Sequence, residues 1–142
     1  MKHLEAKVKR IIIAKVEPTE DLIDSIIKLV KHYDIKSGFL NCIGAFKKIT
    51  LGYYDLNKKI YIYKTFNENV ELISCIGNIA YKDGEPIIHA HVCVGKSNYN
   101  VIGGHLSQPS IISVTGEVCI YEIDQEINRS MESQFDLALI DL

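Results

Sequence analysis

Residues 87–106 read IIHAHVCVGKSNYNVIGGHL, and the first half of this stretch decides which kind of fold the chain can form. Apolar residues occupy every second position over 88–94, the period of two that is typical of a β-strand with one buried face. The alternate positions carry His89 and His91, which therefore share the other face of the strand. A glycine-containing segment then leads to His105. The stretch predicts a sheet strand and a return that carries a third histidine.

Similar patterns recur along the chain and predict a domain dominated by β-structure. Further β-rich segments, separated by turn sequences such as LNKK and KDGEP, lie at residues 8–16, 39–46, 47–55, 59–66, 70–81, 110–123 and 134–142. Short connections between strands favour antiparallel neighbours. Four glycines inside these patterns indicate bulges, bends or close approach of two backbones: Gly38, Gly44, Gly52 and Gly77. We therefore expect a strongly curved sheet.

One helix is predicted after the first strand. Pro18 ends the strand, and Thr19 is expected to be the N-cap, with acidic residues in the first turn. The apolar residues over 22–33 follow the helical period and fall on one side. The predicted fold class is thus α+β, a curved, mainly antiparallel β-sheet with one main amphipathic helix.

Length and charge limit the classes of function. The 142 residues fit a single domain, 1–142, and the 16 basic and 18 acidic side chains give a net charge of -2 with no basic run. Duplex DNA is therefore not the expected partner. The apolar runs are far shorter than the ~20 residues of a membrane span and no signal peptide is recognisable, so we expect a cytoplasmic protein with no membrane association. The four cysteines form no C-x-x-C pair and are expected to be buried, reduced thiols.

The three histidines have the spacing of a metal site. Residues two apart on a strand lie about 6.6–6.8 Å apart, from which the imidazoles of His89 and His91 can converge on one ion. We expect Gly103 and Gly104 to turn the chain and return His105 to the pair. Three imidazoles leave a fourth position for water or a small-molecule ligand, as in catalytic zinc sites. Zinc is the expected ion, although nickel, copper or iron also bind nitrogen ligands.

Other interpretations of these residues stay open. Histidines in strands are often hydrogen-bonded structural residues, and a site of His91 and Cys93 without His89 is a less natural alternative. If the ion is bound, each ligand should donate its second ring N–H to another group, and Glu71 and Glu117 are the carboxylates we consider first. No nucleophile elbow, phosphate loop or dinucleotide fingerprint competes with the histidines.

Five segments together resemble a known family. GFLNCIGAF, VELISCIGNIA, IIHAHVCVG, VIGGHL and GEVCIYEI are similar, in order and spacing, to motifs of the PPC domain, the plant and prokaryote conserved domain. The resemblance runs from about residue 10 to residue 123. It implies a single domain with a curved antiparallel sheet and one main helix, assembled as a homotrimer. The high apolar content, 47%, on strands that one short helix cannot cover also favours an oligomer.

The resemblance also bears on function. Plant members carry AT-hook segments that bind DNA, but this chain has no Arg-Gly-Arg core, so the DNA-binding role is not carried over. Some stand-alone prokaryotic members resemble metal proteins whose ligands correspond to the three histidines here. The pattern is also similar to that of acetolactate decarboxylase, a zinc enzyme of related fold with acidic and arginine groups around its metal. Glu71 and Arg10 are the residues we consider as counterparts.

Three functions follow from the sequence. The first is a trimeric metal-binding protein whose ion could activate a water molecule or a carbonyl group of a small ligand. The second is an assembly or regulatory module in which the histidines are structural. The third is direct DNA binding, which the net charge disfavours.

Overall fold

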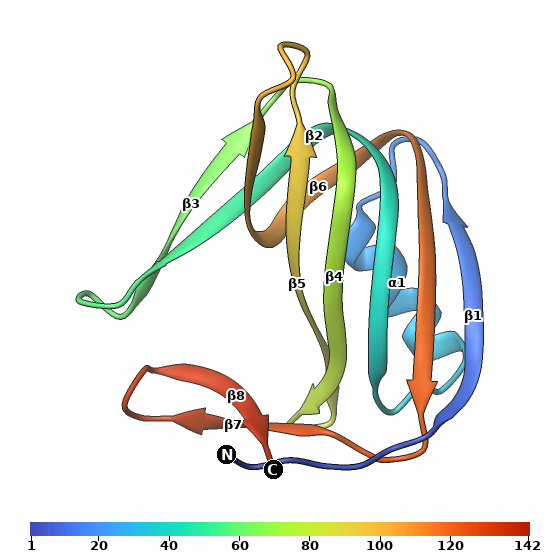
Figure 1. The fold of residues 1–142 in the computed structure, drawn as a ribbon, viewed down its shortest axis with the longest axis vertical. Coiled ribbons are helices and arrows are strands. Elements are labelled where there is room, and N and C mark those ends of the chain that lie inside the picture. The colour runs from blue at the N-terminus through green and yellow to red at the C-terminus, as the bar shows by residue number, and fades with distance from the viewer.

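The computed structural model describes residues 1–142 and contains eight strands and one helix (Figure 1). The elements in chain order are β1 (Val8–Val16), α1 (Leu22–His32), β2 (Gly38–Asp55), β3 (Ile60–Phe66), β4 (Val70–Lys82), β5 (Glu85–Gly95), β6 (Val101–Ile123), β7 (Asn128–Glu132) and β8 (Leu137–Asp141). The predicted α+β class, with a curved and largely antiparallel sheet and one helix, is confirmed.

The sheet closes on itself around four of its strands. Strand β2 pairs with β6, β6 with β5, β5 with β4, and β4 again with β2. This cycle is possible because β2 and β6 are long and bent, so that each pairs with different neighbours along its length. The segments predicted as separate strands at 39–46 and 47–55 are therefore one continuous strand. Strand β6 likewise begins at Val101, well before the predicted residue 110.

The predicted role of Gly44 in bending the sheet is confirmed. The ladder between β2 and β4 shifts register between Cys42 and Gly44, which marks a bulge. Gly44 has φ +149°, and a Cβ at this position would lie 2.0 Å from the carbonyl oxygen of Thr115. The bend therefore requires glycine both for its backbone conformation and for the close approach of β6.

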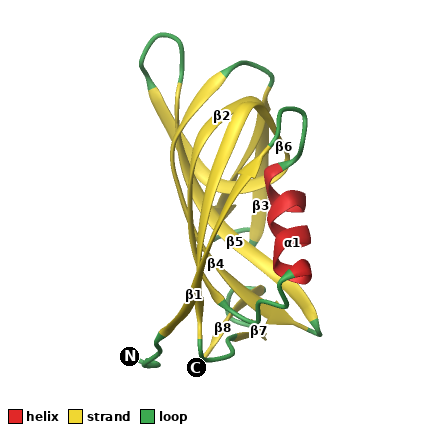
Figure 2. Ribbon diagram, turned by 90° about the vertical axis from the view of Figure 1, so that its right-hand side faces the viewer, coloured by secondary structure: helices red, strands yellow, loops and turns green.

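The helix covers one face of the sheet (Figure 2). Leu22, Ile26 and Val30 of α1 are completely buried against inward side chains of the strands, among them Ala90, Val92 and Val94 of β5. The predicted alternation of β5 is thus confirmed. The N-cap is Asp21 and not Thr19, because the Asp21 side chain accepts hydrogen bonds from the amides of Ile23 and Asp24.

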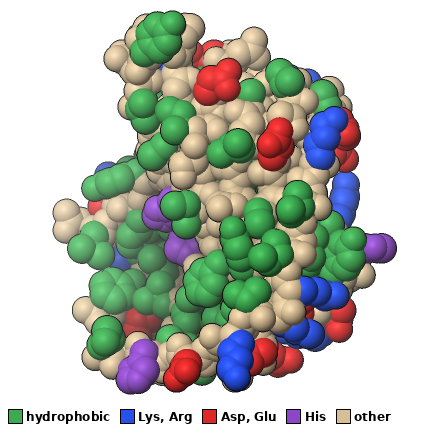
Figure 3. Space-filling model, turned by 45° about the vertical axis from the view of Figure 1, so that its right-hand side comes forward, with side chains coloured by type: hydrophobic (Ala, Val, Ile, Leu, Met, Phe, Trp, Pro, Cys, Tyr) green, Lys and Arg blue, Asp and Glu red, His purple; other side chains and the backbone are tan.

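The other face of the sheet is apolar and exposed. Side chains that stand opposite each other in a ladder share a face. One such row across the sheet contains His105, His91, Ile76, Asn41, Cys119 and Ile13. Ile76 is 67% exposed and Ile13 is 82% exposed, and Phe39 and Ile43 nearby are also exposed. Figure 3 shows hydrophobic side chains gathered over a broad part of the surface, with histidines among them. We call this surface the outer face.

The end of the chain forms a hairpin of β7 and β8. The predicted last strand at 134–142 is found as β8, whereas β7 was not predicted. The hairpin attaches to β4 through a single parallel bridge between Tyr81 and Asn128. Its turn touches the β2–β3 hairpin, since the Tyr54 hydroxyl donates to the carbonyl oxygen of Phe135.

Two further predictions concern cysteines and membranes. All four cysteines are free, but only Cys42 and Cys75 are buried, and Cys93 is exposed on the outer face, contrary to expectation. The alternation of β5 explains the difference, because Cys93 points to the same side as His91. The 11-residue helix is neither long nor apolar enough to span a bilayer.

Candidate metal centre

Strands β5 and β6 bring the three histidines together. His91 stands opposite His105 in the antiparallel ladder, and His89 lies two residues before His91 on the same face. Ring centroids are 5.2 Å apart for His89 and His91, 5.2 Å for His89 and His105, and 5.6 Å for His91 and His105. One nitrogen of each ring lies within 4.8 Å of the others. Small rotations of the rings would let all three nitrogens lie 2.0–2.1 Å from one central ion, which is the zinc–nitrogen distance of imidazole ligands.

His105 reaches the pair by a route that differs from the prediction. The chain turns at residues 96–100, where the amide of Lys96 donates to the carbonyl oxygen of Asn100 and Tyr99 has φ 65°. Gly103 and Gly104 lie within β6, opposite Cys93 and Val92. The hairpin register, and not a glycine turn, therefore places His105.

The environment of His89 and His105 favours their neutral, metal-binding form. Burial, followed by the charges of Arg129 and His91, lowers the pKa of His89. Burial, followed by the charges of His89, His91 and Arg129, lowers the pKa of His105 to about 4. Nδ1 of His105 is buried and has no hydrogen-bond partner in the protein. A buried nitrogen without a partner is costly, and a metal ion would satisfy it. The residues present therefore fit a metal ion.

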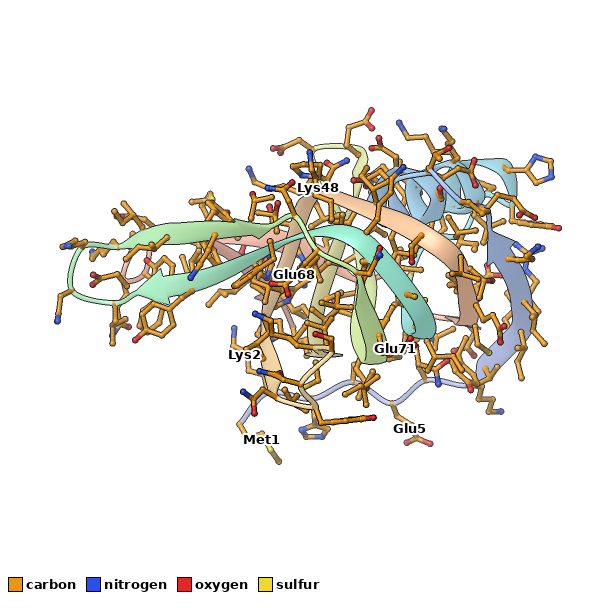
Figure 4. The ribbon with its side chains drawn as sticks, turned by 90° about the horizontal axis from the view of Figure 1, so that it is seen from above. Met1, Lys2, Glu5, Lys48, Glu68 and Glu71 are labelled. Carbon is orange, nitrogen blue, oxygen red and sulfur yellow. The ribbon has the colours of Figure 1, made fainter.

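The carboxylates considered from the sequence do not reach the histidines. Glu71 lies near the start of β4, opposite Gly95 and at the end of the molecule seen in Figure 4. Glu117 stands opposite Ile43 and Lys15. Neither makes a hydrogen bond to an imidazole. Arg10 is also elsewhere, since it pairs with the buried carboxylate of Glu122.

Three residues that were not predicted surround the cluster. The ring of Tyr61, from β3, lies 4.8 Å from that of His105. Asn78 of β4 stands opposite His89 and therefore shares its face. Arg129 of β7 donates from Nη2 to Oδ1 of Asn78 over 2.7 Å. In the sequence, Asn78 lies between Gly77 and Ile79, and this alternation could have predicted that its side chain is on the same face as the histidines. No pattern of neighbouring residues predicts that Tyr61 or Arg129 lies near the cluster.

Gly52 makes room for the tyrosine. It lies between His105 on one side and Tyr63 on the other in the ladders of β2. A Cβ at Gly52 would stand 2.9 Å from Cε1 of Tyr63 and 3.1 Å from Cδ1 of Tyr61. The predicted close approach at Gly52 is confirmed, and it is the tyrosine rings of β3 that approach.

Several solved structures are similar to this chain. A metal-containing protein from Archaeoglobus fulgidus has 31% identity, with 100% of both chains covered and a TM-score of 0.92. A plant- and prokaryote-conserved protein from Pyrococcus horikoshii has 32% identity over 100% of this chain and 98% of that one, with a TM-score of 0.91. A protein from Bacteroides thetaiotaomicron, whose description proposes DNA binding, has 28% identity over 96% of both chains, with a TM-score of 0.89.

The expected distant similarity to acetolactate decarboxylase is confirmed for the fold. The enzyme from Bacillus subtilis has 18% identity and a TM-score of 0.56, with 94% of this chain and 61% of that chain covered. None of the curated proteins matches the chain. The model of the Plants and Prokaryotes Conserved (PCC) domain matches residues 3–124. The chain therefore belongs to the Plants and Prokaryotes Conserved domain family.

Proposed function

We propose that this chain is a metal-binding protein in which His89, His91 and His105 hold one divalent ion. The observation that carries the proposal is the convergence of three imidazole nitrogens within 4.8 Å, one ring having a buried Nδ1 without a partner. The metal-containing relative from Archaeoglobus fulgidus supports it. Zinc is the proposed ion, because three neutral imidazoles with an open position suit it.

The site suits chemistry on a small molecule. A zinc ion held there would supply Lewis acidity toward a bound water molecule or a carbonyl oxygen. The chain itself supplies the wall of Tyr61, whose hydroxyl makes no hydrogen bond within the protein, and the cationic side chain of Arg129. His91 is exposed in the single chain, whereas His89 and His105 are partly buried.

Metal analysis tests this proposal. Wild-type protein, stripped of metal and offered zinc at neutral pH, should retain about one ion per chain, whereas His91→Ala should retain less than a tenth of that amount. His32→Ala is the matched control, because His32 lies at the end of α1, away from the cluster, and should leave the metal content unchanged. Wild-type protein that binds well under one ion per chain would show that the histidines are structural.

We further propose that the outer face is covered by other copies of the chain, in a homotrimer. Ile13, Phe39, Ile43 and Ile76 are each at least half exposed on this face, and isolated monomers rarely leave so many large apolar side chains together in water. Because His91 and Ile76 are neighbours in the β4–β5 ladder, such an assembly would bring another subunit close to the metal centre.

We also propose that the chain does not bind duplex DNA and that it works in the cytoplasm. The net charge of -2 continues to argue against useful affinity for duplex DNA at physiological salt. Free thiols at all four cysteines fit a reducing compartment such as the cytoplasm.

A further inference from the structure

Arg129 is a buried cation without a counter-ion. The residue is 8% exposed, yet no carboxylate forms an ion pair with it. Its two Nη atoms donate to neutral oxygens, the carbonyl of Ala138 at 2.8 Å and Oδ1 of Asn78 at 2.7 Å. Its Nε is buried and has no partner. A guanidinium stays protonated in proteins, so this positive charge needs an anion that the chain does not provide.

The missing anion would lie beside the metal centre. Arg129 is fixed to Asn78, and Asn78 stands opposite His89 on the same face of the sheet. Arg129 lies beyond residues 3–124, the part of the chain that the family model matches. The C-terminal hairpin thus adds a cation to the site.

With a divalent ion bound, the site as a whole would carry a net positive charge. Three neutral imidazoles would leave the double charge of a divalent ion uncompensated, and Arg129 adds one further positive charge. Neither Glu71 nor Glu117 is close enough to pair with either cation. A small ligand that occupies the site must therefore bring negative charge with it.

We infer that the three-histidine site takes a small organic carboxylate, one carboxylate oxygen being received by the guanidinium of Arg129. The inference rests on the metal site proposed above and names the class of its ligand. A carboxylate is favoured over phosphate because phosphate sites gather several basic side chains or the backbone amides of a helix N-terminus, whereas the strands here bring a single guanidinium to the site. Tyr61 offers a flat apolar surface for the organic part of the ligand.

Calorimetric titration with a matched pair of probes tests the inference. Lactate and lactamide have the same hydroxyl group and differ in the charged carboxylate, and inorganic phosphate serves as the other anion. Zinc-loaded wild-type protein should bind lactate at least 10-fold more tightly than lactamide and more tightly than phosphate. Equal binding of lactate and lactamide would overturn the inference, and tighter binding of phosphate would overturn the choice of carboxylate.

Variants then assign the effect to Arg129. Arg129→Met should weaken lactate at least 10-fold, leave lactamide unchanged and keep one zinc per chain. Arg129→Lys keeps the positive charge but loses the planar arrangement of guanidinium donors, so this variant should lose part of the affinity for lactate. Lys64→Met is the control. Lys64 lies on the opposite face of β3 from Tyr61 and Tyr63, so this substitution also removes one positive charge, but away from the site. An unchanged ratio of lactate to lactamide in Arg129→Met would refute the role of Arg129.

The two proposals fail in different ways. Absence of zinc from wild-type protein would contradict the metal site. The lactate and lactamide comparison can still be made on that metal-free protein, where discrimination that depends on Arg129 supports the anion site and its absence rejects it. If the Arg129→Met protein folds poorly, the comparison of lactate with lactamide on wild-type protein still tests the inference, because it needs no variant.

Discussion

Tyr61 lies against His105 with their ring centroids 4.8 Å apart, although the strands that carry them do not pair with each other. Strand β2 runs between them and contributes Gly52 at the crossing point. The ring of Tyr61 can therefore reach the metal centre across β2, because Gly52 has no side chain to block it. Because Tyr61 and His105 meet across Gly52, we expect the fold to tolerate substitutions of Gly52 poorly.

Gly52→Val should destabilise the protein by about 1–3 kcal/mol, because the new side chain overlaps the rings of Tyr61 and Tyr63. Urea unfolding measures this change. Gly95→Val is the control, since a Cβ there meets only the mobile end of Ile73 at 3.1 Å and the Cβ of Glu71 at 3.9 Å. Equal free energies of unfolding for the two variants would show that the space above Gly52 is not needed.

The metal-free protein should lose stability as the pH falls from 6.5 to about 4. Burial, followed by the charges of its neighbours, lowers the pKa of His105 from 6.5 to about 4, so in this window the unfolded chain binds the proton and the folded chain does not. The contribution is fully present above pH 6.5. After allowance for solvent screening of this half-exposed group, it is about 1–2 kcal/mol.

Urea unfolding of metal-free protein at pH 7 and pH 4.5 measures this loss. His105→Asn removes the titrating group, so the variant should lose less stability over the same interval than the wild type. Parallel losses in the two proteins would mean that His105 is not held neutral by its surroundings.

The four cysteines should differ in reactivity toward iodoacetamide. Burial raises the pKa of Cys42 and of Cys75 to about 12, and only the thiolate reacts. Cys93 is exposed on the outer face of the single chain and should be alkylated in the monomeric Ile76→Lys variant under native conditions. Peptide mapping by mass spectrometry, with and without guanidinium chloride, distinguishes the sites. Alkylation of Cys75 in native protein would contradict its burial in the hydrophobic core.

Ile76→Lys should abolish assembly without unfolding the chain. Ile76 is 67% exposed, so the substitution removes few contacts within one chain but places a charge in the centre of the outer face. Sedimentation should give a multiple of 16.0 kDa for the wild type and 16.0 kDa for the variant. Ile62→Lys on β3 is the matched control and should remain assembled. A wild-type monomer at micromolar concentration would end the trimer proposal.

Local pattern explains which parts of the site could be predicted. The shared face of His89 and His91 follows from the period of a strand, which depends only on neighbouring residues. The approach of His105 was expected, but through the wrong turn, because the hairpin at residues 96–100 carries no glycine. Strand β5 and helix α1 were found for the same reason, since each repeats its own period over many residues.

The remaining features depend on contacts between distant segments. Arg129 reaches the centre only because the terminal hairpin attaches to β4, through one bridge between Tyr81 and Asn128. Tyr61 reaches it because β3 pairs with the far half of a bent β2. Register over such separations is set by the packed sheet, and it leaves no periodic trace in the sequence. The same holds for the merging of two predicted strands into β2.

The pairing of β1 has a consequence for synthesis of the chain. Strand β1 pairs only with the last part of β6, so Val16 finds its partner Gly116 one hundred residues later. At translation rates of about 5–20 residues per second, β1 waits on the order of 5–20 s on the ribosome without its neighbour. During that interval its exposed edge and apolar side chains can pair with other nascent chains. Truncations that end before residue 116 should therefore aggregate, however well the helix and the first hairpins form.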